Sequence, residues 1–156
     1  AGKYPIESVK TMAEIAETTE SNIHYNKRFH NAAFEIRNSV DAISHSTCGM
    51  AIDLNAKAIV ACSLSGMTAR MVSRFRPPMD IIGLTTVEKK WRKLSLSWGV
   101  LPVMCEKYNS TDVMFYTATQ KAKEVLGLKK GDRIVLTGGV TNGKSGNTDL
   151  IKVASI

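Results

Sequence analysis

The chain has 156 residues and a formal net charge of +7, and its 44% apolar and 22% charged residues suit a single globular domain. No apolar run reaches the roughly 20 residues that span a bilayer and no basic-then-apolar leader opens the chain, so neither a membrane partner nor a signal peptide is expected. Dispersed basic residues with only 6% aromatics argue against a nucleic-acid partner, and three widely spaced cysteines favour a cytoplasmic protein over a disulfide scaffold.

Two stretches at the start of the chain are predicted to be helical. Residues 5–23 place apolar side chains on one face, namely Val9, Met12, Ala16 and Ile23. Residues 29–54 repeat the pattern, and Ser39 followed by Asp41 could cap a new start there, so this stretch is one helix or two helices end to end. Asn55 is expected to end it in a left-handed conformation.

From residue 57 onward, short apolar runs alternate with helical segments. The predicted strands are 58–62, 81–85, 100–104, 133–137 and 149–154, and the predicted helices are 68–76, 88–98 and 111–126. Alternation of this kind produces right-handed crossovers and parallel strands, whereas the last two strands have no helix between them and should be antiparallel. The prediction is a three-layer α/β/α domain, with a mostly parallel sheet of about five strands, preceded by a helical segment.

The turn after the first predicted strand is the sharpest candidate site. Ligands of open α/β sheets bind beyond the carboxyl ends of the strands, and a helix starting at Met67 or Thr68 would point its free N–H groups there. Gly66 would let the backbone approach an anion, and polar side chains could contact its oxygens, namely Ser63, Ser65, Thr68 and Arg70. Serine and threonine are also ordinary helix caps, so phosphate binding and plain capping both stay open. The turn is neither a Walker A loop nor a GxGxxG fingerprint, which disfavours nucleotide hydrolysis and dinucleotide binding.

The loop at residues 138–147 is a second candidate, because it joins two strands at the same end of the predicted sheet. Small and cationic residues in it could fold over a bound anion, namely Gly143, Lys144, Ser145 and Gly146. A flexible hairpin connection is the alternative interpretation.

No catalytic or metal site is expected from the residues alone. The histidines lie in the two helical stretches before the first predicted strand, residues 5–54, which we call the lead-in. They have neither HExxH spacing nor a cysteine partner. Cys48 on a predicted helix, and Cys62 and Cys105 on apolar strands, are expected to be buried, inert thiols. No GxSxG motif or carboxylate pair is present, so no reaction can be inferred from the sequence pattern.

Taken in order, motifs along the whole chain resemble pyruvate kinase from the end of its catalytic barrel onward. They are Gly2-Lys-Tyr-Pro5, Glu7-Ser-Val-Lys-Thr-Met12, Ala42-Ile-Ser-His45, Ala56-Lys-Ala-Ile-Val-Ala61, Ser65-Gly-Met-Thr-Ala-Arg70, Val72-Ser-Arg-Phe-Arg-Pro77, Trp98-Gly-Val100, Leu128-Lys-Lys-Gly-Asp132, Thr137-Gly-Gly139, Ser145-Gly146 and Thr148. Each motif is weak alone, but their order and spacing make the match specific. The resemblance implies that residues 1–25 are the last barrel helix and a linker, and that residues 26–156 are the C-terminal α/β domain.

The resemblance also implies a function for this domain. Pyruvate kinase moves phosphate between phosphoenolpyruvate and ADP in glycolysis, and its catalytic groups and its Mg²⁺ and K⁺ sites lie on the barrel. We therefore expect no catalysis by this chain alone and no cofactor in it. The family's C-terminal domain contacts its counterpart in a tetramer and, in many members, binds an activating sugar phosphate. Carried over by position, the phosphate loop is residues 63–68, which include Leu64 and Met67, and the loop at 138–146 closes the pocket.

The chain departs from this family pattern at two positions. Members that bind fructose 1,6-bisphosphate often place a tryptophan and an arginine before the fourth strand, where this chain has Lys107 and Met114. Lys107 could be a second anion contact as a point charge, but Met114 cannot replace an arginine's bidentate contacts. A nucleotide monophosphate or sugar monophosphate, such as AMP or ribose 5-phosphate, therefore stays open as the effector. The alternative is a purely structural subunit-assembly domain with no effector site.

Overall fold

The computed structural model describes residues 2–139 and 147–156. Its elements, in chain order, are α1 (Pro5–Ser21), α2 (Tyr25–Asn31), α3 (Ser39–Asp53), β1 (Ala58–Cys62), α4 (Met67–Arg74), β2 (Asp80–Thr85), α5 (Glu88–Leu94), β3 (Val100–Met104), α6 (Thr111–Leu126), β4 (Arg133–Gly138) and β5 (Leu150–Ser155). Every strand predicted from the sequence is present, and each lies within one residue of the expected bounds at either end.

The five strands form one sheet in the order β3-β2-β1-β4-β5. Strands β1 to β4 run parallel to their neighbours, whereas β5 pairs antiparallel with β4. All five residues of β1 are buried, as the continuous apolar run predicted, because helices cover both faces of the central strands. The predicted α/β class, with a mostly parallel sheet and an antiparallel last strand, is confirmed.

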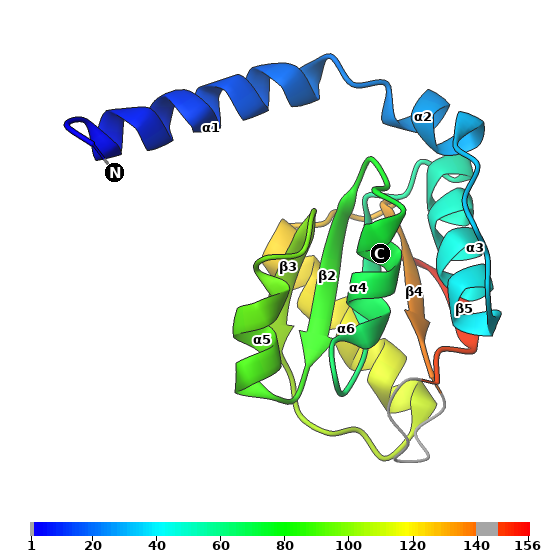
Figure 1. The fold of residues 1–156 in the computed structure, drawn as a ribbon. Coiled ribbons are helices and arrows are strands. Elements are labelled where there is room, and N and C mark those ends of the chain that lie inside the picture. The colour runs from blue at the N-terminus through cyan, green and yellow to red at the C-terminus, as the bar shows by residue number, and fades with distance from the viewer. Residues whose placement is uncertain (1, 140–146) are drawn as a thin grey trace.

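Helices pack on both faces of the sheet and create two core layers. Figure 1 shows α4 and α5 in front of the sheet and α6 behind it, with α3 beside α4. The front layer joins α3, α4 and α5 to the sheet through Cys48, Val72 and Leu94. The back layer packs α6 on the sheet through Phe115 and Ala118.

Helix α5 is shorter than the predicted segment 88–98. It ends at Leu94, whose side chain is buried, and the chain then turns through residues 95–99 to enter β3. The Trp98 carbonyl accepts a 2.6 Å hydrogen bond from the Ser73 hydroxyl of α4, so a contact between helices holds this turn. The predicted boundary was wrong because Trp98 belongs to a tertiary contact and not to the helical repeat.

The lead-in contains separate helices, as one of the two sequence interpretations proposed. Residues 32–38 are not helical, and Asn55 has the left-handed φ of 49° expected after α3. The N-cap of α3 is Asn38, one residue earlier than the predicted Ser39, and its side chain accepts from the Asp41 backbone N–H. Helix α1 has no buried residue and lies away from the sheet in Figure 1.

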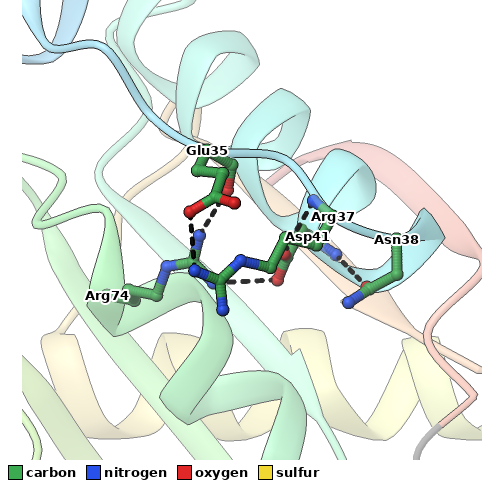
Figure 2. Close-up of polar contacts among 5 residues, drawn as sticks. All are labelled: Glu35, Arg37, Asn38, Asp41 and Arg74. Atoms are coloured by element: carbon green, nitrogen blue, oxygen red, sulfur yellow. Dashed lines mark hydrogen bonds and ion pairs between the residues drawn. The ribbon is translucent and has the colours of Figure 1, made fainter.

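A polar network attaches the 35–38 segment to the domain, as Figure 2 shows. The Arg74 guanidinium donates to the Asp41 carboxylate at 3.0 Å and to the Glu35 backbone carbonyl at 2.7 Å. The other Asp41 carboxylate oxygen accepts from the Arg37 backbone N–H at 3.2 Å. Asp41 is buried, and a buried carboxylate needs protein donors. Arg74 and the Arg37 backbone supply them, one to each oxygen. We call these contacts the linker latch.

Candidate functional site

The turn at residues 63–68 lies where the strand order of the sheet reverses. From β1 the chain proceeds through α4 to β2 on one side, whereas β4 and β5 lie on the other side of β1. Connections that leave β1 and β4 in opposite directions open a crevice between the carboxyl ends of these strands. The position of the turn is thus the ligand-binding position of this class of sheet.

Gly66 is required in this turn for two physical reasons. Its φ of 75° is left-handed, and it is the residue that precedes the first residue of α4. A Cβ atom there would lie 3.2 Å from both Cδ atoms of Leu94, which is tighter than ordinary contact. Helix α4 therefore begins at Met67, one of the two predicted starts, and its free N–H groups face the end of β1.

Neighbouring strands hold the turn on both sides. The Thr85 hydroxyl, at the end of β2, donates to the Leu64 carbonyl at 3.1 Å. On the other side, the hydroxyl oxygens of Thr68 and Thr148 lie 2.7 Å apart, and Thr148 precedes β5 by two residues. Sequence reasoning did not assign Thr85 or Thr148 to the site, since both are far from the turn along the chain and no local motif connects them to it.

The remaining predicted contacts differ in their surroundings. Ser63 and Ser65 are partly exposed, and no other residue within the described ranges 2–139 and 147–156 bonds to their hydroxyls. Arg70 is exposed and lies in the first turn of α4. The turn after β1 therefore contains two hydroxyls without a described partner, one paired hydroxyl and a helix N-terminus, and Arg70 lies on the helix that follows.

Lys107 lies in a different place from the turn. It lines a pocket of about 690 Å³ between the end of β3 and α6, together with Tyr108 and Lys121. No residue of the 63–68 turn lines this pocket, so a role for Lys107 as a second contact of the same anion stays a prediction. Met114 is buried in the back core layer and offers no polar contact.

The second predicted loop lies mostly outside the described residues, which exclude Gly143, Lys144, Ser145 and Gly146. The two described ends of this connection meet at the end of the sheet where the turn also lies, beyond the carboxyl ends of β1 and β4. The Asp149 N–H donates to the Gly138 carbonyl at 3.0 Å, and the Thr137 hydroxyl donates to the Leu150 carbonyl at 3.0 Å. The return of the chain into β5 is thereby fixed next to the turn.

The thiols are placed for packing. Burial raises the pKa of Cys48 to about 12 and also raises the pKa of the fully enclosed Cys62. The prediction for Cys105 was wrong, because it lies after the end of β3 and is only half-buried; burial is the main cause of its raised pKa. Within the described residues no three His, Cys, Asp or Glu side chains could together hold a metal ion, and no helix has the length and apolarity to cross a bilayer.

Comparison with known proteins relates the chain to one family. A family model described as pyruvate kinase, alpha/beta domain, matches residues 41–154. The chain is 44% identical over 153 residues to a pyruvate kinase of Clostridium acetobutylicum, covering 97% of this chain and 32% of that protein. It is 41% identical over 154 residues to pyruvate kinases of Staphylococcus epidermidis and Staphylococcus aureus, covering 98% of this chain and 26% of each. The chain thus spans about a third or less of the length of these curated relatives.

Proposed function

Because this chain belongs to the pyruvate kinase family and corresponds to its α/β domain, we propose that it is a regulatory module which binds a phosphorylated effector at the 63–68 turn. The effector is a sugar phosphate or a nucleotide monophosphate. Transfer of phosphate from phosphoenolpyruvate to ADP is the proposed activity of a full-length enzyme, and this chain contributes regulation to it. A cytoplasmic location is part of the same proposal.

The observation that carries the proposal is the combination of donors at the reversal point of the sheet. The left-handed Gly66 precedes the first residue of α4, and the adjoining residues Ser63 and Ser65 carry hydroxyls that bond to no described residue. Arg70 adds a positive charge one helical turn further on. A phosphate needs several donors and a favourable dipole, and hydroxyls, a cation and a helix N-terminus are groups of that kind, which supports the proposal.

Calorimetric titration of the chain with fructose 1,6-bisphosphate, AMP and ribose 5-phosphate tests this proposal. We expect saturable binding of one of them, and Ser65→Ala should weaken it by about tenfold or more, because a charge-assisted hydrogen bond is lost. Ser95→Ala is the matched control, since Ser95 is an exposed serine beyond α5. Equal affinity of the Ser65 variant and the control would exclude the turn as the site, and absence of any binding would favour the structural alternative.

A second role, subunit assembly, is supported by the difference between the two edges of the sheet. At one edge, Pro102 in β3 lacks an N–H, and its carbonyl accepts a 2.9 Å bond from the Trp91 indole. Both features protect an edge strand from pairing with another chain. At the other edge, β5 contains no proline and exposes Val153. We propose that β5 is the edge that contacts a second copy in a homo-oligomer, with a tetramer as the full-length form.

Sedimentation velocity over a range of concentrations tests the assembly role. Val153→Glu should shift the chain toward monomer, because it places a charge in the proposed contact. Val125→Glu on α6 is the matched control, since the two valines are 41% and 43% exposed. A monomeric unchanged chain, or an equal effect of both substitutions, would argue against β5 as the contact.

A further inference from the structure

The hydroxyl pair of Thr68 and Thr148 joins two parts of the chain that lie 80 residues apart in sequence. Both residues are buried, and their hydroxyl oxygens are 2.7 Å apart, the distance of a good hydroxyl hydrogen bond. Thr68 belongs to the first turn of α4, and Thr148 lies two residues before β5. The pair thus connects the candidate anion turn to a segment that has no other role in that site.

The bond between the two threonines leaves one of their two hydroxyl hydrogens without an acceptor among the described residues. Each threonine hydroxyl carries one hydrogen and can accept two bonds, so a bond between the two uses a single hydrogen. Within the described residues, neither hydroxyl has another hydrogen-bond partner. A buried hydroxyl hydrogen without an acceptor is unfavourable, and an anion seated at the turn would supply acceptor oxygens.

We infer that Thr148 is a positioning residue of the phosphate site, which donates to the Thr68 hydroxyl so that Thr68 directs its own hydrogen to the bound phosphate. This inference rests on the proposed function of the 63–68 turn. The opposite arrangement, with Thr68 donating to Thr148, would use the only hydrogen of Thr68 and leave it unable to donate to an anion. Two hydroxyl bonds in series also polarise each other, which strengthens the bond to the phosphate.

We call the chain of bonds from Thr148 through Thr68 to the phosphate the hydroxyl relay. Calorimetric titration with inorganic phosphate tests it. Thr148→Val keeps the branched shape and removes the hydroxyl, so it should weaken phosphate binding about threefold to tenfold in calorimetry. Thr148→Ser keeps the hydroxyl and should bind within about twofold of the unchanged chain. The matched control is Thr47→Val, which removes a buried hydroxyl bonded to the Ile43 carbonyl within α3 and should leave the affinity unchanged.

A double substitution separates positioning from general destabilisation. In a Thr68→Val background the relay is already absent, so Thr148→Val should have no further effect on phosphate affinity. If Thr148→Val proves too unstable, Thr148→Ala in the same two backgrounds provides the comparison. Equal or tighter binding by the Thr148 variant, or an equal further loss in the Thr68→Val background, would overturn the relay alone. Absence of saturable phosphate binding by the unchanged chain would overturn both the relay and the proposed site.

Discussion

Helices α1 and α6 have nearly the same length, 17 and 16 residues, and both carry an apolar stripe. Helix α6 buries Phe115 and Ala118 against the sheet, whereas α1 leaves the side chains of Val9, Met12 and Ile15 exposed. Helical periodicity therefore predicted both helices correctly, but it contains no information about which surface covers the stripe. The prediction that residues 1–25 form the last helix of a catalytic barrel would give α1 a partner, and it stays a prediction.

The strongest test of this contrast replaces one covered and one uncovered isoleucine by alanine. Ile59 in β1 is fully buried and Ile15 in α1 is 60% exposed. Ile59→Ala should lower the free energy of unfolding by about 2–5 kcal/mol, because it removes buried methyl groups and leaves a cavity. Ile15→Ala should change it by less than about 0.5 kcal/mol. Urea unfolding followed by circular dichroism measures both, and a large loss at Ile15 would show that α1 is covered in solution.

A smaller effect is expected at the linker latch, which attaches residues 35–38 to the domain. Arg74→Met should lower the free energy of unfolding by about 1–3 kcal/mol, because it leaves the Asp41 carboxylate buried without its charged partner. Arg92→Met removes an ion pair with Glu88 in which both side chains are exposed, and should cost less than about 1 kcal/mol. The comparison uses the same unfolding measurement. Equal losses would mean that the latch contributes no more than an exposed ion pair.

The smallest effect is expected from a histidine that holds the lead-in onto the domain. His45 of α3 stacks on Phe29 with ring centroids 4.8 Å apart and meets Phe34 and Phe75 edge-on. Burial lowers the pKa of His45, because the charged ring would lose water contact. The unfolded chain then binds a proton at higher pH than the folded chain does, so folding stability should decrease as the pH falls below about 6.5.

The His45 contribution can be isolated by substitution. His45→Phe should flatten the dependence of unfolding free energy on pH between about 7 and 5, since it removes the titrating group and keeps an aromatic ring. His30→Gln is the control, because His30 is an exposed histidine on α2, and the pH dependence should persist in that variant. An unchanged dependence after His45→Phe would assign it to other groups.

Most of the fold followed from local pattern. Continuous apolar runs identified β1 and β4, since only a strand covered on both faces needs them. Helix α6 has the predicted bounds, and its ends carry local signals, namely the Ser110 side-chain cap and the left-handed Gly127, which act within one turn of the helix. Errors occurred where a distant residue intervened, as at Trp98, whose carbonyl bonds to Ser73.

The candidate site was predictable only in its local part. The residues at 63–68 follow a buried strand and include a glycine, so the start of α4 could be placed from the sequence. Which of its hydroxyls are available could not, because the partner of Thr68 comes from another strand connection. Lys107 was assigned by position in a family pattern, and the structure places it in a pocket that the turn does not share.

The amino-acid sequence alone determined the order of helices and strands, the buried character of the central strands and the glycine-bearing turn, since periodicity and backbone preference act over a few residues. Only the tertiary structure decided that α1 stays uncovered, that Arg74 attaches the linker, and that Thr148 contacts Thr68. These outcomes depend on burial and on hydrogen bonds between residues tens of positions apart. Such contacts form only when the sheet order brings the segments together.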